Sequence, residues 1–259
     1  MVIGLERLED RVVPAIGPST PWHFSPADNF AAGSYNAPGD PGHVGFNLVY
    51  VSSPEQLALV PAGDKALVDM GRMTNGVDSN FLNSIRPYIG NPKVFGFYLV
   101  DEPNPAVVPA SNLKAESDWI HANDPGTKTF MVMGAGPFLP FFPSYTPQNT
   151  DIDLIGLDPY PIRTSGVDYE YIPLAVITAE WLGWSPDQIM PVYQSFGNMG
   201  SFAAPTAEQE QMILAIWGML TPNPAFDYAY SWGDWSGMSL VDRPDLQAVF
   251  MVHNTNTLP

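Results

Sequence analysis

The sequence alternates short apolar runs of strand length with polar loops and segments of helical spacing. The clearest apolar runs are HVGFNLVYVS (43–52), VFGFYLVDE (94–102) and KTFMVMG (128–134). Strands that are apolar on both faces and alternate with helices form parallel sheets that are covered on both sides. The eight predicted strands are residues 19–26, 43–52, 65–71, 94–102, 128–134, 153–161, 190–197 and 226–235.

Helical patterns separate most of these strands, and Thr206 with Gln209 resembles a capping box at the start of one of them. Eight such units predict a closed (β/α)8 barrel, or TIM barrel, for which about 250 residues is typical. An open doubly wound sheet is the alternative, but no glycine-rich phosphate loop follows the early strands. The predicted helices are residues 54–60, 79–89, 111–124, 169–183, 206–220 and 242–254.

The predicted barrel is minimal and has an irregular fifth unit. AGPFLPFFPSYTPQNT (135–150) contains four prolines, which leave no room for an ordinary helix. Residues 19–259 are expected to form a single barrel domain, and residues 1–18 an N-terminal extension. Three tryptophans at helical spacing among apolar residues are predicted core residues: Trp119, Trp181 and Trp217.

The charge balance narrows the possible partners. Acidic residues outnumber basic ones 27 to 10, and the formal net charge is −17. A phosphate backbone would be repelled by this charge, so no nucleic-acid partner is expected. There is no cysteine, which excludes disulfides, thiolate nucleophiles and cysteine metal sites. Apolar runs stay short of the roughly 18 residues that span a bilayer, so no membrane insertion is expected.

The first residues bear on localisation. MVIGLERLEDRVVPA lacks the basic and apolar regions of a signal peptide. Its LERLEDR segment resembles one found near the N-termini of some exported bacterial proteins. That resemblance implies a secreted or cell-surface bacterial protein, with residues 1–18 related to export.

Carboxylates end two of the apolar runs, and a proline follows each of them. Glu102 ends the fourth predicted strand and Asp158 the sixth. Side chains along a barrel strand alternate between the axis and the helices, and catalytic groups lie at the carboxyl-terminal rim. Phe95, Phe97 and Leu99 are expected to face the helices, while Glu102 and Asp158 point inward.

The same alternation places Asp69, Gln194, Trp232 and Asp234 near the rim, and sets Asp101 facing away from the axis. An acid at a strand end can instead cap a turn. Trp232 and Trp235 can instead fill the barrel. The candidate substrate-binding residues are Asp101, Asn104, Tyr98, Tyr160, Gln194, Trp232, Asp234, Trp235, Asp69 and His23.

Inward carboxylates among aromatic side chains fit glycoside hydrolysis. One carboxyl must be protonated to donate to the leaving oxygen, and another must be ionised to attack or to activate water. An apolar strand end is expected to raise the pKa of Glu102 by desolvation, which suits the acid, and Asp158 is the second carboxylate. No G-x-S-x-G elbow and no H-x-H or H-E-x-x-H pair occurs, so no metal site and no cofactor are expected. A hard cation held by the rim carboxylates is the alternative.

FGFYLVDEPN (95–104) resembles the fourth-strand motif of (β/α)8 glycoside hydrolases of the large retaining clan, in which Asn-Glu-Pro or Asp-Glu-Pro carries the acid/base. A G-F-N second strand, a D-x-Y-P sixth, a Q-S-F seventh and a Y-S-W eighth occur in matching order. The set is most similar to the DEP-bearing relatives of agarase-type and β-glycosidase barrels. The resemblance implies that Glu102 is the acid/base and that Asp101 contacts the sugar 2-hydroxyl in place of the clan's asparagine.

Gln194 departs from the clan, which has its nucleophilic glutamate at the end of the seventh strand. Three alternatives follow: Asp158, Asp69 or Asp234 is the second carboxylate, the substrate assists its own hydrolysis, or the barrel only binds glycans. A carboxyl separation of about 5–5.5 Å indicates retention and about 6.5–9.5 Å inversion.

The sequence therefore predicts a monomeric glycoside hydrolase that acts within a polysaccharide or oligosaccharide, using Glu102 with Asp158. A non-catalytic carbohydrate-binding barrel is the first alternative. A structural domain of a surface protein is the second, which the 28 prolines and the LERLEDR start favour.

Overall fold

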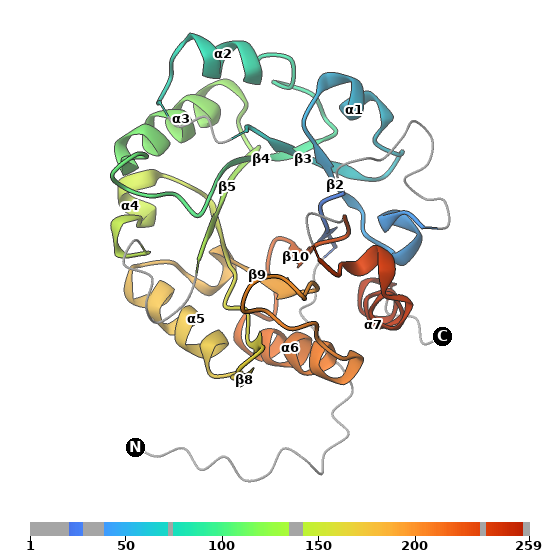
Figure 1. The fold of residues 1–259 in the computed structure, drawn as a ribbon. Coiled ribbons are helices and arrows are strands. Elements are labelled where there is room, and N and C mark those ends of the chain that lie inside the picture. The colour runs from blue at the N-terminus through green and yellow to red at the C-terminus, as the bar shows by residue number, and fades with distance from the viewer. Residues whose placement is uncertain (1–20, 28–38, 72–74, 135–141, 234–236, 256–259) are drawn as a thin grey trace.

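The computed structural model describes residues 21–27, 39–71, 75–134, 142–233 and 237–255. Within them, eight parallel strands close into a barrel in the order β1-β10-β9-β6-β5-β4-β3-β2, and helices surround it (Figure 1). The predicted (β/α)8 barrel is confirmed. Its strands are β1 His23–Phe24, β2 Leu48–Val51, β3 Lys65–Asp69, β4 Val94–Asp101, β5 Lys128–Met133, β6 Leu154–Leu157, β9 Ile189–Gln194 and β10 Asp227–Tyr230.

Four of the described α-helices begin after a residue whose side chain accepts a hydrogen bond from a free backbone N–H of the first turn. The predicted capping box is present: the Thr206 hydroxyl accepts from the Gln209 N–H at 3.2 Å, and the Gln209 side chain accepts from the Thr206 N–H at 2.9 Å. The α-helices in the described part of the chain are α1 Pro54–Leu59, α2 Ser79–Ile85, α3 Ala110–Asn123, α4 Pro147–Thr150, α5 Tyr171–Trp181, α6 Ala207–Leu220 and α7 Pro244–Thr255.

The fifth unit is irregular, as the prolines indicated. The residues described between β5 and β6 form a 3-10 turn, Phe142–Ser144, and the single turn of α4. The next connection holds a feature that the sequence did not indicate, a small antiparallel hairpin of β7 (Ile162–Arg163) and β8 (Gly166–Val167). Two residues per strand are too few to show an alternating pattern.

The inside of the barrel is filled by aromatic and branched side chains. The ring of Phe226 contacts the rings of Phe24, Phe95 and Phe130 edge-on, at 6.2, 5.7 and 4.9 Å between centroids. Edge-to-face packing of this kind helps to fill the inside of the barrel with side chains. Phe95 therefore contributes to the interior, and the prediction that it faces the helices is wrong. Phe97 and Leu99 pack on the helix side as predicted.

The three tryptophans predicted to be core residues differ in burial. Trp217 is buried, and Trp119 packs against the buried core. Trp181 is 92% exposed, so the prediction for it is wrong. Helix α5 is apolar on all sides, and it turns Ile172, Ala175, Val176 and Ala179 inward, which leaves its last residue in solvent. A helix with apolar residues on every face does not reveal its buried face from spacing alone.

None of the helices in the described residues has the length and apolar character that a membrane span requires.

Candidate active site

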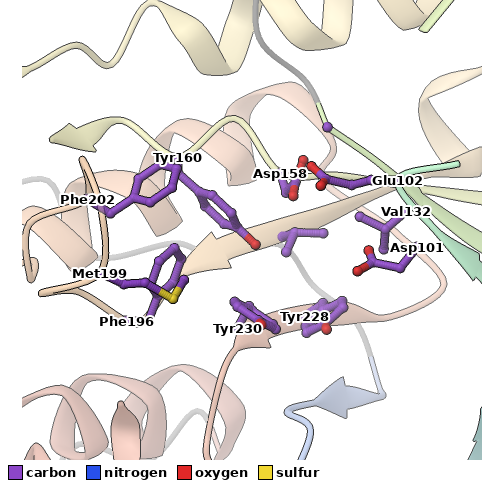
Figure 2. Close-up of a pocket in the computed structure, with 12 residues that line it drawn as sticks. Asp101, Glu102, Val132, Asp158, Tyr160, Phe196, Met199, Phe202, Tyr228 and Tyr230 are labelled. Atoms are coloured by element: carbon purple, nitrogen blue, oxygen red, sulfur yellow. The ribbon is translucent and has the colours of Figure 1, made fainter. Parts of the chain in front are cut away.

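A cavity of about 340 Å³ opens at the carboxyl-terminal end of the barrel. Ligand pockets in proteins commonly range from about 300 to 1,000 Å³. Carboxylates gather on one side of this cavity and apolar side chains on the other (Figure 2). The described residues that line it are Asp101, Glu102, Val132, Gly134, Asp158, Tyr160, Val192, Phe196, Met199, Phe202, Tyr228 and Tyr230.

Strand β4 brings two adjacent carboxylates to this cavity because its alternation is interrupted. The register against β5 shifts between Tyr98 and Val100. Leu99 and Val100 consequently both belong to the helix-side core, and the next residue, Asp101, turns back to the cavity. The prediction that Asp101 faces away from the axis is therefore wrong, because a bulge inserts one residue into the pattern.

Glu102 follows directly, in an unusual backbone conformation. Its φ is 42°, in the left-handed region, and its N–H donates to the carbonyl of Val132 at 2.9 Å. A non-glycine residue held there costs on the order of 1–2 kcal/mol, and such residues cluster at functional sites. The Glu102 side chain is exposed rather than desolvated. The desolvation that the sequence predicted for Glu102 is therefore not observed.

Strand β6 follows the predicted alternation and delivers Asp158. Ile155 and Leu157 pack on the helix side, and Leu154 packs inside the barrel. A Cβ added at Gly156 would lie 2.9 Å from the side chains of Phe130 and Val132, so the interior has room only for glycine there. Asp158 comes next on the inward side and lines the cavity half-exposed.

Three tyrosines interact electrostatically with the carboxylates of Asp101 and Asp158. The Tyr98 hydroxyl donates to Oδ1 of Asp101 at 2.9 Å. Burial raises the pKa of Tyr98, Tyr160 and Tyr228 well above its ordinary value, and the charges of Asp101 and Asp158 raise it further. These phenols therefore stay protonated and can act as hydrogen-bond donors.

The cavity is strongly acidic. Three carboxylates line it, and its described lining holds no lysine, arginine or histidine. Like charges that share one site favour retention of a proton on one member. The arrangement can therefore present a protonated and an ionised carboxyl together, which is the requirement for general acid–base chemistry.

The wall opposite the carboxylates is aromatic. The ring of Tyr160 lies edge-on to Phe196 at 4.8 Å and to Phe202 at 5.5 Å, and is stacked with Tyr230 at 6.3 Å. Phe196, Met199 and Phe202 lie in the segment between β9 and α6, which has no periodic pattern, so sequence reasoning did not select them. Tyr228 precedes Tyr230 by two residues on β10, and the inward alternation expected of that strand applies to both.

Gln194, which the resemblance placed at the clan's nucleophile position, is fully buried and does not line the cavity. Its side-chain oxygen accepts from the Ile162 N–H, and its amide donates to the carbonyls of Ile162 and Ala203. The side chain therefore fixes the β7–β8 hairpin against β9, and its hydrogen-bonding groups are used for that.

Three other predicted site residues take part in local structure outside the cavity. Asp69 accepts from the Tyr50 hydroxyl and caps a turn by accepting from the Gly71 N–H at 3.0 Å. Asn104 accepts from the Ala106 N–H at 2.9 Å in an exposed turn. Trp232 is buried in the helix-side core, because β10 ends at Tyr230 and its alternation does not continue. Asp234 and Trp235 lie outside the described residues.

His23 was predicted to lie near the rim and does not. It is the first residue of β1, its register partner is Asp227 at the start of β10, and its ring contacts that carboxylate. Strand starts in a parallel barrel lie at the end opposite the cavity. The first strand is too short to fix from sequence which of its residues reaches the rim.

No protein-family model matches this sequence. A comparison with curated proteins also finds no match.

Solved structures do match the fold. A fungal endo-beta-N-acetylglucosaminidase from glycosyl hydrolase family 18 aligns with a TM-score of 0.60 over 92% of this chain and 98% of that one, at 14% identity. A putative alpha-L-fucosidase from Bacteroides thetaiotaomicron gives 0.60 over 99% of both chains at 11% identity. A Bacteroides uniformis beta-glucuronidase gives 0.61 over 93% of this chain and 36% of that one, at 10% identity. These likenesses support the (β/α)8 barrel.

Proposed function

We propose that this chain is a glycoside hydrolase that cleaves an O-glycosidic bond with Glu102 as general acid. The observation that carries the proposal is the convergence of Asp101, Glu102 and Asp158 on one cavity at the carboxyl-terminal end of a (β/α)8 barrel. Catalytic groups of such barrels occur at that end. That the solved structures of similar fold named above include glycosidases adds support by analogy of fold.

The proposed roles follow from exposure and contacts. Glu102 is the most exposed of the three carboxyls, and a substrate that enters from solvent would meet it first. Asp158 lies among Tyr160 and Tyr228, and in its ionised form it would attack the anomeric carbon or activate a water. Asp101, oriented by Tyr98, would accept a hydrogen bond from a sugar hydroxyl.

The aromatic wall would supply binding energy. Rings of Tyr160, Tyr230 and Phe196 offer apolar surface on which the C–H face of a sugar can pack while the opposite acidic wall binds hydroxyls. We propose a carbohydrate chain as the substrate, attacked internally. Export to the cell surface or medium, proposed from LERLEDR, would bring a monomeric enzyme to such a polymer.

A second function, a non-catalytic carbohydrate-binding barrel, is favoured by one observation. The strand end at which the clan has its nucleophile holds Gln194, with its amide fully occupied by backbone groups. A barrel that has lost its nucleophile but retains an aromatic and acidic cavity would bind glycans without cleaving them.

A glycan screen distinguishes the hydrolase from the binding barrel. Purified protein is incubated with a panel of polysaccharides and oligosaccharides, and both reducing-end release and binding are measured. Cleavage that Asp158→Asn reduces at least 100-fold supports the hydrolase. ¹H NMR of the first product then gives the anomeric configuration, retained if Asp158 is the nucleophile and inverted if it is the base. Binding without cleavage across the panel would support the binding barrel.

A further inference from the structure

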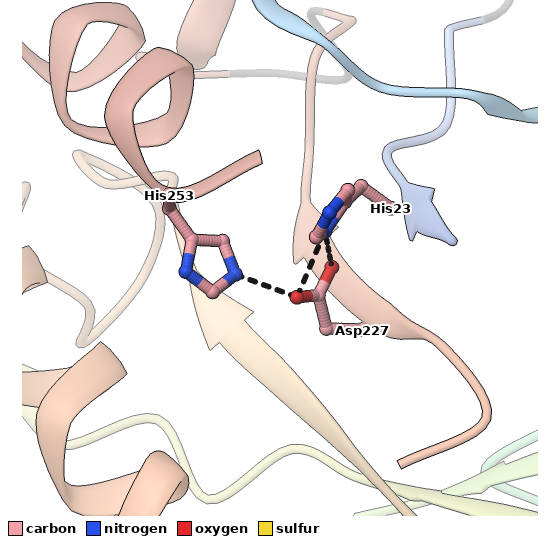
Figure 3. A group of neighbouring side chains, drawn as sticks. All are labelled: His23, Asp227 and His253. Carbon is pink, nitrogen blue, oxygen red and sulfur yellow. Dashed lines mark hydrogen bonds and ion pairs between the residues drawn. The ribbon is translucent and has the colours of Figure 1, made fainter. Parts of the chain in front are cut away.

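Three side chains that are far apart in the sequence meet at the end of the barrel opposite the acidic cavity. They are His23 of β1, Asp227 of β10 and His253 near the end of α7 (Figure 3). Nδ1 of His23 lies 2.9 and 3.1 Å from the two Asp227 oxygens, and Nε2 of His253 lies 2.6 Å from Oδ2. The sequence held no spaced histidine pair, because these residues come together only through barrel closure.

The donor atoms suit a transition-metal ion. One nitrogen from each histidine and one carboxylate oxygen all lie within 4.8 Å of one another. Zinc takes imidazole and carboxylate ligands at about 2.0–2.2 Å in a tetrahedral arrangement, which separates neighbouring ligand atoms by about 3.4 Å. An ion would therefore require each histidine nitrogen to move less than an ångström away from the Asp227 oxygen that it contacts. The two histidine nitrogens, which lie within 4.8 Å of each other, would then be about 3.4 Å apart.

The burial of the three side chains and the negative charge of Asp227 also favour a bound cation. The side chains are 5%, 1% and 5% exposed for His23, Asp227 and His253. A buried carboxylate is costly unless a positive group compensates it, and a divalent ion would do so. The Tyr193 phenol, 3.5 Å from Oδ2 of Asp227, lies beside the site and could orient the carboxylate or supply a fourth ligand.

A histidine elsewhere in the fold, His121, has two acidic neighbours and shows the contrast. His121 reaches Asp151 through Nδ1 at 3.3 Å and Asp153 through Nε2 at 2.9 Å. Since the two nitrogens lie on opposite sides of the ring, these ligands cannot converge on one ion. His121 therefore serves as a matched control.

We propose that His23 Nδ1, His253 Nε2 and Asp227 bind one divalent transition-metal ion, with Zn²⁺ as the best fit. Two imidazoles and a single carboxylate favour zinc and its neighbours over Ca²⁺ or Mg²⁺, which prefer oxygen ligands. The ion is structural, because the site lies at the opposite end of the barrel from the carboxylate cavity. It joins the first strand, the last strand and the last helix where a two-residue β1 closes the barrel.

The test uses untagged full-length protein stripped with EDTA and then dialysed. Zinc binding is measured by calorimetry and by metal analysis after gel filtration, and Tm is recorded with and without Zn²⁺ and with Mg²⁺. We expect about one zinc per chain and, at a hundredfold excess over Kd, a rise in Tm of about 5–10 °C. Mg²⁺ should have no comparable effect.

Two variants separate metal ligation from hydrogen bonding. In His23→Asn and His253→Gln, the new amide can still donate to Asp227 from nearly the same position as the lost ring nitrogen but is a poor zinc ligand. Both should fold and lose zinc binding at least 100-fold, whereas His121→Gln should bind zinc like the wild type. Folded wild-type protein that binds no zinc, or binding that survives in both site variants, would overturn the proposal.

Discussion

The side chain of Gln194 accepts a hydrogen bond from the backbone N–H of Ile162 and donates one to its carbonyl, each at 2.8 Å. This paired contact holds the hairpin that follows β6 against the end of β9. Gln194, which resembles a lost nucleophile in the sequence, therefore has a structural role in the fold. The catalytic carboxylates, in our account, come from β4 and β6 instead.

Replacement of Gln194 by glutamate should destabilise the protein without creating a nucleophile. A carboxylate cannot donate to the carbonyls of Ile162 and Ala203, and the added charge would be buried. We expect a loss of about 3–5 kcal/mol in the free energy of unfolding, measured by urea denaturation. Gln211→Glu, on the exposed side of α6, should stay within about 0.5 kcal/mol. Higher activity in Gln194→Glu would contradict this account.

Removal of the Tyr98 hydroxyl should lower catalytic activity. Its hydrogen bond to Asp101 orients a carboxylate that lines the cavity, and a bond to a charged group is worth about 1.5–3 kcal/mol. Tyr98→Phe should reduce kcat/KM about tenfold or more on the substrate found by the glycan screen. The matched variant Tyr50→Phe removes a similar bond to Asp69, outside the cavity, and should have a smaller effect. Equal losses in both would remove the special role of the Tyr98–Asp101 pair.

The stability of the protein should fall as pH rises, because of a buried acid on α6. Burial raises the pKa of Glu210 to about 8, although Ser195 and Arg243 oppose the rise. The unfolded chain releases this proton near pH 4.5 and the folded chain near pH 8, so the folded state binds more protons in between. Stability from this group is complete below pH 4.5 and declines by about 1.4 kcal/mol per pH unit up to about pH 8.

Glu210→Gln removes the titration while it keeps the shape. Urea denaturation at pH 5.5, 6.5 and 7.5 should show a shallower decline in this variant than in the wild type, by about one proton. The exposed-site variant Glu208→Gln, on the same helix, should leave the slope unchanged. Parallel slopes for wild type and Glu210→Gln would show that Glu210 is not protonated in the folded state.

Truncation of two tryptophans should change the stability of the protein by very different amounts. Trp217 is fully buried in the helix-side core, and Trp217→Ala should cost about 3–5 kcal/mol. Trp181 is 92% exposed, and Trp181→Ala should stay within about 0.5 kcal/mol. Thermal denaturation of both variants checks this. A comparable loss of Tm for Trp181→Ala would mean that its ring is covered.

The barrel was predictable because its strands are continuous apolar runs with helices between them. Regular alternation on β6 also led correctly to Asp158 at the cavity. On β4 the same rule failed, since the bulge after Tyr98 reverses the facing of Asp101 and no sequence signal marks it. Trp232 was misplaced for a similar reason, because β10 ends two residues earlier.

Contacts between distant segments could not be predicted at all. The aromatic wall depends on a non-periodic segment after β9, which brings Phe196 and Phe202 against Tyr160. The pairing of His23 and His253 with Asp227 joins the two ends of the described chain and exists only once the barrel has closed.

The role of Glu102 as the acid is tested most directly by comparing Glu102→Gln with the wild type on one substrate, with turnover and binding measured together. We predict that turnover falls at least 1,000-fold, while Tm and glycan affinity stay close to those of the wild type, since the amide keeps the shape but cannot donate the proton. Unchanged turnover in Glu102→Gln would contradict the assignment of this residue as the acid.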